Sequence, residues 1–328
     1  ASEGALAWVS EAWRDGGRVH GDGYLYKVGE SPKLPGVEMA AEDYRKLARF
    51  AKTDTPPTLE ILSRVRYHDD DTKAYNIIAD LPGRDRKAGY VMAGAHLDSW
   101  VASDGAQDNA AGSVVVMEAA RILKKLQLKP KRTIRFVLWN GEEQGMLGSK
   151  DYVEKHFATR APLADPEQAN IEPFYTWRLR YPVTKSQGYG DLAGYFNLDN
   201  GSGKVRGIYA EGNFAAVPIF KEWLAPFASM GATQVAVKRT GGTDHVFMQD
   251  IGLPGFQFIQ DPLDYSSRTH HSDVDSYDHL KMPDLKQATV ILASMLLMAA
   301  ERDEPLPRLP VPNAPQATDP FEYRDEGS

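Results

Sequence analysis

The chain has 328 residues, of which 42% are hydrophobic, 25% charged and 10% aromatic, a composition typical of a globular protein with a substantial core. Disorder, collagen and coiled coil are excluded as the main architecture. Because 45 Asp and Glu outnumber 38 Lys and Arg, the net charge is −7, and no broad cationic surface indicates nucleic acid or anionic membrane as a partner. The chain has no cysteine, so a metal site would depend on His, Asp and Glu.

No stretch approaches the run of about 20 apolar residues that spans a bilayer. The longest candidate, residues 288–300, contains Thr289 and Ser294, and a buried helix is predicted there. The sequence begins with Ala-Ser-Glu-Gly and shows neither an initiator Met nor a signal-peptide pattern. We therefore expect a processed or truncated form of a longer protein.

Composition divides the chain into three parts. Residues 1–55 combine a short apolar run, a Gly- and Asp-rich turn region and an amphipathic helix near 41–52, and are too few to hold a core alone. Residues 56–304 alternate strands with helices from about Thr58, which predicts an α/β domain with a largely parallel sheet. Residues 305–328 are Pro-rich and form a predicted tail.

Four short apolar runs bounded by Gly, Pro or Asn are predicted to be central strands buried on both faces. They cover residues 90–95, 133–139, 194–198 and 255–259. Two long helices are predicted as well. One covers 110–126 with an apolar side, and the other starts at Pro283, a residue suited to a first helical turn, and ends near Arg302.

Residues 154–189 are rich in Pro, Arg and aromatic side chains and lack clear periodicity. A connection of this length inside a compact domain is usually a lid, an oligomerisation arm or an insertion. The segment is therefore predicted to cover a site or to support a homodimer. The alternative is a loop that is merely packed on the surface.

Ionisable side chains follow each of the four predicted strands. In chain order they are His96 and Asp98, Glu142 and Glu143, Asp199, and, after a loop, His270 and His271. Ligand crevices in open α/β sheets lie outside the carboxyl ends of the strands, so these groups are expected to converge. Asp108, just before the helix at 110–126, is expected at the same edge of the sheet.

Two His and three carboxylates suit a hydrolytic centre with two zinc ions. One carboxylate would bridge ions about 3.5–4 Å apart, and Asp108 is the natural bridge. Asp98 lies two residues after His96, on the same face if the strand continues, and could accept the other imidazole N–H. Glu142 and Glu143 diverge in extended backbone, so Glu143 could bind metal while Glu142 acts as general base on the water.

Each of these residues alone also has a plain structural explanation. Asp108 could cap its helix, and the adjacent glutamates could form a solvated surface. The acidic run at 69–71 has no strand-end placement and is interpreted as a solvated turn.

At these positions the sequence resembles a known family, the co-catalytic zinc exopeptidases, which includes bacterial secreted leucyl aminopeptidases and glutamate carboxypeptidases. The segments that carry the resemblance are residues 95–100, 108–112, 140–145, 198–200 and 271–275. Residues 129–133, 242–244 and 270–272 add a closer resemblance to the plasma glutamate carboxypeptidase branch and its bacterial relatives. The resemblance covers roughly residues 76–308.

The resemblance implies a mixed sheet between helices and two zinc ions per chain. The implied metal ligands are His96, Asp108, Glu143, Asp199 and His271. Asp108 would bridge the ions, Glu142 would be the general base and Asp98 would orient His96. Family members remove single residues from peptide termini or split dipeptides, so a short peptide is the expected substrate, in an extracytoplasmic location, periplasmic or secreted.

The sequence departs from the family pattern at two places. Many relatives have Tyr immediately before the last His ligand, where this chain has His270, as does the plasma glutamate carboxypeptidase branch. His270 is therefore predicted to stabilise the oxyanion, and the alternative is that it only packs against the cleft wall. Residues 5–40 resemble only the final portion of a protease-associated domain, so the missing N-terminal portion of the same protein is an expected partner.

Two other functions remain open at this point: a one-zinc enzyme similar to glutaminyl cyclase, and a non-catalytic binding domain on the same fold. End preference is open too. Lys238, Arg239 and Arg268 are candidates for binding a substrate carboxylate, and Asp244 or Asp264 for binding an ammonium group.

Overall fold

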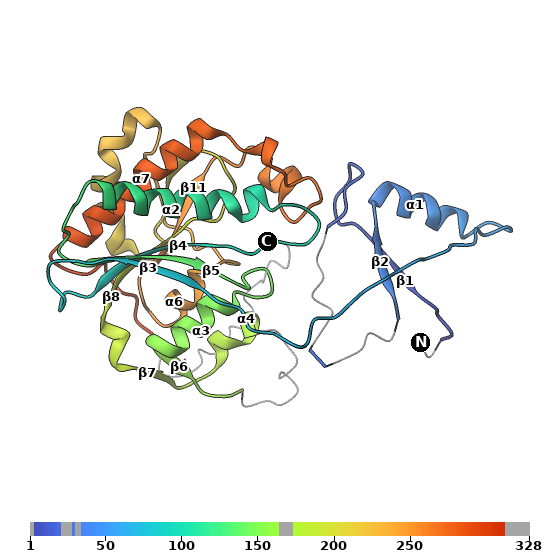
Figure 1. The fold of residues 1–328 in the computed structure, drawn as a ribbon, viewed down its shortest axis with the longest axis horizontal. Coiled ribbons are helices and arrows are strands. Elements are labelled where there is room, and N and C mark those ends of the chain that lie inside the picture. Colours follow the sequence, from blue (N-terminus) through green and yellow to red (C-terminus); the bar gives the residue numbers. More distant parts are fainter. Residues whose placement is uncertain (1–2, 21–27, 30–33, 164–172, 312–328) are drawn as a thin grey trace, which may run out of the picture.

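The computed structural model describes residues 3–20, 28–29, 34–163 and 173–311. A large α/β unit and a small N-terminal unit lie side by side (Figure 1). The strands are β1 Trp8–Glu11, β2 Gly36–Met39, β3 Ile77–Leu81, β4 Tyr90–His96, β5 Thr133–Trp139, β6 Ala158–Arg160, β7 Val183–Lys185, β8 Leu192–Asn197, β9 Val205–Tyr209, β10 Gln234–Ala236 and β11 Gly255–Gln260. The α-helices are α1 Ala41–Phe50, α2 Ala111–Lys125, α3 Leu147–His156, α4 Pro173–Thr176, α5 Val217–Leu224, α6 Val246–Asp250 and α7 Met282–Glu301.

A seven-stranded sheet forms the centre of the large unit, in the order β10-β9-β11-β8-β4-β5-β3. The inner strands β11, β8, β4 and β5 are parallel neighbours, whereas β9 and β3 pair antiparallel with β11 and β5. The predicted fold, a mixed and largely parallel sheet flanked by helices, is confirmed. Parallel neighbours place their carboxyl ends at one edge, and β4 and β5 end in register at His96 and Trp139.

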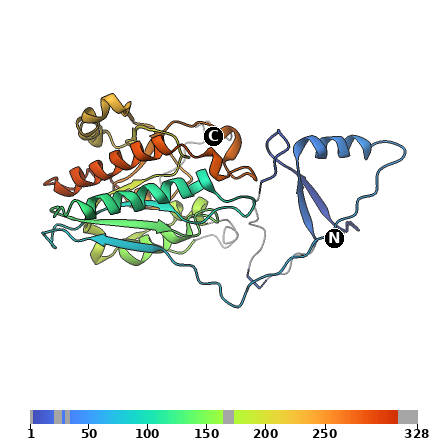
Figure 2. The same ribbon diagram turned by 45° about the horizontal axis from the view of Figure 1, so that its top comes forward.

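Helices cover both faces of this sheet. Helices α2 and α7 lie side by side on one face, and α3 and α6 lie on the other (Figures 1 and 2). The first face packs around residues such as Phe196 and Ile291, and the second around residues such as Tyr195 and Phe247. Because successive side chains of a strand point to opposite faces, β8 contributes to both apolar layers.

The predicted elements agree with the observed ones at the centre of the sheet and less well at its edges. All four predicted strands and both long predicted helices are present within two residues of their expected ends. The edge strands β3 and β10 and the neighbouring strand β9 were not predicted, since short strands carry weak patterns. The expected start of alternation near Thr58 is wrong, because residues 53–76 form neither helix nor strand and the first strand begins at Ile77.

The N-terminal unit consists of the parallel pair β1 and β2 with helix α1 beside it (Figure 2). Ala12 and Ala41 are buried, but the side chains of Leu6, Trp8 and Trp13 are exposed. A two-stranded sheet with one helix buries little apolar surface. The assignment of this unit to the end of a protease-associated domain stays a prediction.

The segment 154–189 contains the end of α3, the antiparallel pair β6 and β7, and helix α4. Residues 164–172 of it lie outside the described residues. The start of the predicted tail is packed on the large unit, because Leu306 is buried and its N–H donates to the carbonyl of Ala193. The rest of the tail, 312–328, also lies outside the described residues.

None of the helices in the described ranges is long and apolar enough to cross a membrane. Residues 288–300 belong to α7, which packs in the core as predicted.

The aromatic cluster between the sheet and α5 provides a test of this core. Phe220 is fully buried and its ring lies edge-on to that of Phe256, with 4.7 Å between centroids. Phe220→Ala should lower the free energy of unfolding by about 3–5 kcal/mol, because it leaves a cavity. Phe214→Ala, at a side chain that is 75% exposed, should change the free energy of unfolding by less than about 0.5 kcal/mol. Urea titrations of both variants measure these changes. Equal effects of the two substitutions would contradict this core assignment.

Candidate metal centre

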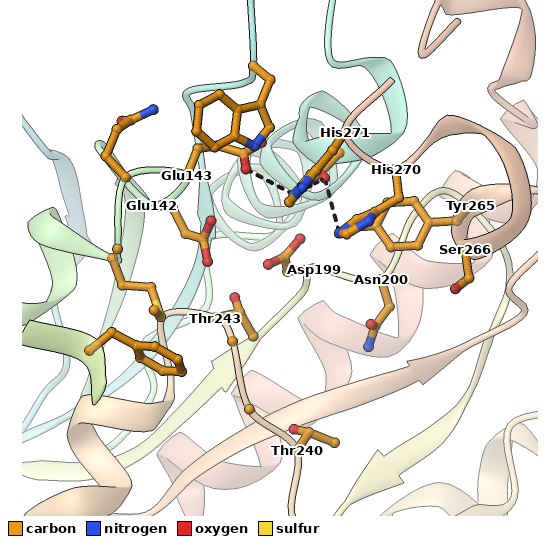
Figure 3. Close-up of a pocket in the computed structure, with 18 of the residues that line it drawn as sticks. Glu142, Glu143, Asp199, Asn200, Thr240, Thr243, Tyr265, Ser266, His270 and His271 are labelled. Atoms are coloured by element: carbon orange, nitrogen blue, oxygen red, sulfur yellow. Dashed lines mark ion pairs between the residues drawn. The ribbon is translucent and has the colours of Figure 1, made fainter. Parts of the chain in front are cut away.

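The predicted site residues lie at the carboxyl edge of the central sheet and in the loops beside it (Figure 3). His96 is the last residue of β4, and Asp199 lies two residues beyond β8. Glu142 and Glu143 follow β5, and Asp108 lies in the irregular turn before α2. The two consecutive histidines come from the loop after β11.

Asp108 does not cap the helix that follows it. The side chain of Asn109 has that role, since its Oδ1 accepts the N–H of Gly112 at 3.0 Å. The carboxylate of Asp275 holds the Asp108 backbone by accepting its N–H at 2.9 Å. A Cβ on Gly112 would collide with the carbonyl oxygen of Leu198, so glycine lets the start of α2 approach the end of β8. This packing brings Asp108 close to Asp199.

The carboxylate of Asp108 lies between two histidine groups. Its Oδ1 is 3.1 Å from His96 Nε2, which is also 3.3 Å from Asp199 Oδ1. Its Oδ2 is 3.4 Å from His271 Nε2, which is also 3.1 Å from Glu143 Oε2. Each histidine thus has two carboxylates beside it, and each oxygen of Asp108 belongs to a different group.

These groups fit zinc in both chemistry and spacing. Imidazole nitrogen and carboxylate oxygen bind zinc at about 2.0–2.2 Å, which in a tetrahedral arrangement separates ligand atoms by about 3.4 Å. Asp108 Oδ2 and Asp199 Oδ1 are buried and have no hydrogen-bond partner among the described residues. Buried oxygens without a donor are costly, and a cation bound beside them would compensate that cost.

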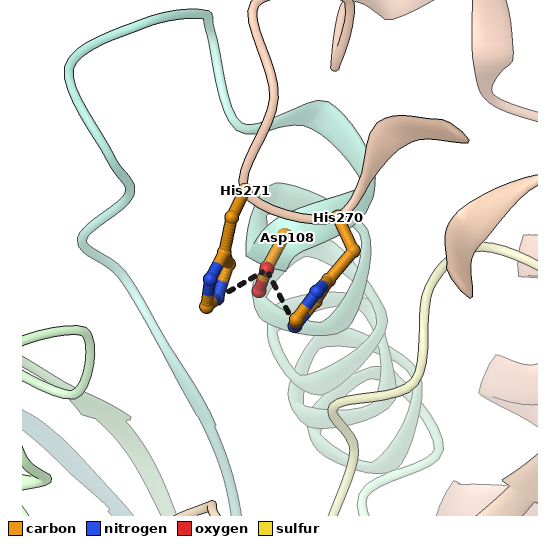
Figure 4. Close-up of side chains that lie close together, drawn as sticks. All are labelled: Asp108, His270 and His271. Atoms are coloured by element: carbon orange, nitrogen blue, oxygen red, sulfur yellow. Dashed lines mark ion pairs between the residues drawn. The ribbon is translucent and has the colours of Figure 1, made fainter. Parts of the chain in front are cut away.

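The backbone at His271 is not extended, and the side chains of His270 and His271 do not diverge. His271 has φ of 59°, in the left-handed region, and the two imidazole rings stack with centroids 3.7 Å apart. Both rings point toward Asp108 (Figure 4). His270 Nε2 is 3.8 Å from Asp108 Oδ2, farther than His271 Nε2, and these three residues also form a group that could hold an ion.

Asp98 connects the ends of β4 and β5. Its carboxylate accepts the backbone N–H groups of Glu142 and Glu143 at 3.1 and 3.2 Å. The Nδ1 of His96 is 2.9 Å from the backbone oxygen of Asp98 and 3.8 Å from its Oδ1. With Nε2 as the ligand atom, Nδ1–H donates to this backbone oxygen. Residue 98 therefore orients His96 through its main chain and both glutamates through its side chain.

Burial and mutual repulsion shift the pKa values of the carboxylates. Burial raises the pKa of Glu142 well above its usual range and that of Glu143 to about 7. Burial would also raise the pKa of Asp108, but the hydrogen bond and charge of His96 outweigh it and lower the value to about 2. Burial lowers the pKa of His270 to about 4, so this imidazole is neutral at pH 7.

A cavity of about 800 Å³ opens above these residues (Figure 3). The site residues among its lining are Asp108, Glu142, Glu143, Asp199, His270 and His271. Sequence reasoning missed Trp13 and Arg14, which line the cavity from the N-terminal unit, and Trp100. Phe174 and Tyr175 also line it, so the segment 154–189 reaches the site.

The residues proposed from the sequence to bind a substrate terminus do not line this cavity: Lys238, Arg239, Arg268, Asp244 and Asp264. Arg239 donates to Gln249, and Asp264 pairs with His279. Asp244 is buried, and burial raises its pKa to about 8.

A family model described as Peptidase family M28 matches residues 76–296. The chain belongs to peptidase family M28. The family resemblance noted in the sequence is thereby confirmed. Carboxypeptidase Q from Bos taurus is 28% identical over 277 residues, which cover 84% of this chain and 52% of that protein. The chain thus spans about half the length of this curated relative.

Solved structures of M28 and zinc peptidases have the same fold. A peptidase M28 precursor from Shewanella amazonensis matches with a TM-score of 0.66 and 24% identity, over 95% of this chain and 63% of that chain. A zinc aminopeptidase from Bacillus subtilis matches with a TM-score of 0.58 and 21% identity, over 92% of this chain and 66% of that chain.

Because Asp108 lies between the two histidine groups, replacing it should weaken zinc binding. Zinc should raise the Tm of the wild-type chain, since a ligand at about 100 times its Kd adds about 2.7 kcal/mol to stability. Asp108→Ala should abolish most of this rise, because both histidine groups lose a carboxylate oxygen. Asp151→Ala, at an exposed carboxylate on α3 that pairs with Lys155, is the matched control and should keep the rise. An unchanged response of Asp108→Ala would contradict the assignment.

Proposed function

We propose that this chain is a two-zinc exopeptidase that hydrolyses the terminal peptide bond of short peptides or dipeptides. The observation that carries the proposal is the shared carboxylate, because the two oxygens of Asp108 lie 3.1 and 3.4 Å from histidines at the end of β4 and in the loop after β11. Family membership and the names of the relatives, a carboxypeptidase and a zinc aminopeptidase, support it.

The proposed ligands divide into two sets. His96, Asp108 and Asp199 would hold one ion, and Asp108, Glu143 and His271 the other. When bound, the two ions supply Lewis-acid polarisation of the scissile carbonyl and lower the pKa of water. Each His approaches its carboxylate neighbours through Nε2.

Glu142 is the proposed general base. It is almost fully buried, lines the cavity and belongs to neither ligand set. Its carboxylate would take a proton from the attacking water and give it to the leaving amine. A pKa raised by burial suits a carboxyl group that must hold a proton between these two steps. The hydrogen bond from its N–H to Asp98 fixes its backbone.

His270 is the proposed oxyanion donor. It lines the cavity, and the ring of Tyr265 packs edge-on to it at 5.0 Å between centroids. Since burial lowers its pKa to about 4, the neutral ring carries one N–H at pH 7, which can donate to the developing oxyanion.

The two adjacent glutamates should respond differently to substitution by Gln. Glu142→Gln should keep its zinc and lose about 10²–10⁴-fold in kcat, because it removes the base without removing a ligand. Glu143→Gln should lose zinc affinity instead. Metal analysis after dialysis, together with kcat on a dipeptide, separates the two results. The reverse pattern would exchange the two roles, and one zinc per wild-type chain would favour the one-zinc alternative similar to glutaminyl cyclase.

The two adjacent histidines allow a second comparison. His270→Phe should retain two zinc ions while kcat falls by about 10²–10³-fold, the effect of losing one oxyanion donor. His271→Phe should lose an ion. Near-normal kcat in a folded, zinc-loaded His270→Phe protein would leave His270 with a packing role. Loss of metal in that variant would make His270 the ligand.

A further inference from the structure

Residues 14–20 are bound to the loop that carries the two site histidines. The N–H of Asp273 donates to the carbonyl of Val19 at 3.0 Å, and the N–H of Val19 donates to the carboxylate of Asp273 at 3.1 Å. An isolated antiparallel bridge pairs His20 with Ser272. Arg18 donates to the backbone carbonyls of residues 267 and 268 at 2.7 and 3.1 Å.

This contact places Trp13 and Arg14 in the wall of the cavity. The Nη1 of Arg14 donates to the carbonyl of His270 at 3.1 Å. The guanidinium also lies 3.8 Å from the centroid of the Trp13 ring, and that ring approaches His270 edge-on at 6.4 Å between centroids. The hydrogen bond and the ring contact together hold the guanidinium beside the proposed metal centre.

The charges in the cavity wall are distributed unequally. The acidic residues of the wall all belong to the proposed metal centre: Asp108, Glu142, Glu143 and Asp199. Arg14 is the single Lys or Arg among the described residues that line the cavity. The remaining lining side chains are aromatic, apolar or neutral polar groups apart from the two histidines. With zinc offsetting the carboxylates, Arg14 is therefore the cationic side chain that a substrate anion would meet in the described wall.

We propose that Arg14 binds the free C-terminal carboxylate of the peptide substrate. The planar guanidinium presents its N–H donors in a fork that matches a carboxylate, and its Nη1 also donates to the carbonyl of His270. Because Arg14 contacts the residue whose imidazole faces Asp108, the carboxylate that it binds belongs to a residue close to the scissile bond. The preferred substrates are short peptides with an unblocked C-terminus. This inference rests on the proposed exopeptidase function.

The test compares a dipeptide free acid with the same dipeptide as its C-terminal amide. The zinc-loaded wild type should prefer the acid by about 10- to 100-fold in kcat/KM, the range expected for charge-assisted hydrogen bonds. Arg14→Gln should remove that preference by lowering kcat/KM for the acid, mainly through KM, and should leave the amide within about 2-fold. Arg14→Glu should instead favour a substrate whose C-terminus is an aminoethyl amide, which is a cation.

Arg18→Gln is the matched control, because it removes bonds to the same loop from a residue that does not line the cavity. It should leave the preference for acid over amide unchanged. If Arg14→Gln lowers kcat/KM for the acid and for the amide by the same factor, Arg14 acts only on the loop and the proposal is wrong. If Arg14→Gln lowers kcat/KM only for an amide that carries an acidic side chain, Arg14 binds that side chain and the proposal is also wrong.

Calorimetry measures how tightly the zinc-loaded chain binds the acid and the amide. This measurement tests the carboxylate site independently of catalysis. A wild-type protein that binds the acid more tightly than the amide, through Arg14, but hydrolyses neither would refute the proposed exopeptidase function and retain the carboxylate site. Equal binding of acid and amide by the wild type would refute the carboxylate site alone.

Discussion

The buried carboxylate of Asp108 is the constraint on which the site depends. Its two oxygens face histidines at the end of β4 and in the loop after β11, and its Oδ2 has no hydrogen-bond donor in the described part of the chain. Carboxylates gathered in a buried space repel one another unless cations lie among them. The surrounding structure holds them in place: Asp275 fixes the Asp108 backbone, and Gly112 allows α2 to approach the end of β8. Bound metal ions would therefore compensate the negative charge of these carboxylates better than an empty cavity would.

The register of the sheet links this arrangement to the adjacent pair Glu142 and Glu143. Strands β4 and β5 end side by side, so that Asp98 beyond one strand reaches the backbone amides beyond the other. One short side chain thereby sets the position of both Glu142 and Glu143. A parallel sheet offers such links naturally, because its strand ends meet at one edge.

Local sequence patterns predicted the centre of the fold and the side chains that gather there, because buried strands are apolar runs and polar residues at their ends stand out. Other features depend on information that these patterns do not contain. Arg14 is separated from His270 by 256 residues, and no periodicity links them. The stacking of His270 on His271 depends on a left-handed backbone angle, which an assumption of extended backbone could not supply. The short strands β9 and β10 are defined by their partners more than by their composition.

The exposed, irregular stretch from 53 to 76 has a consequence for how the N-terminal unit stays at the site. This stretch joins the two units covalently and so acts as a tether between them. A tether of this kind keeps a docked element at an effective local concentration on the order of millimolar. A handful of hydrogen bonds around Val19 and Arg18 is then enough to keep the unit docked, although the same contacts between separate molecules would be weak. Cleavage within the stretch would turn this docking into a concentration-dependent association of two fragments.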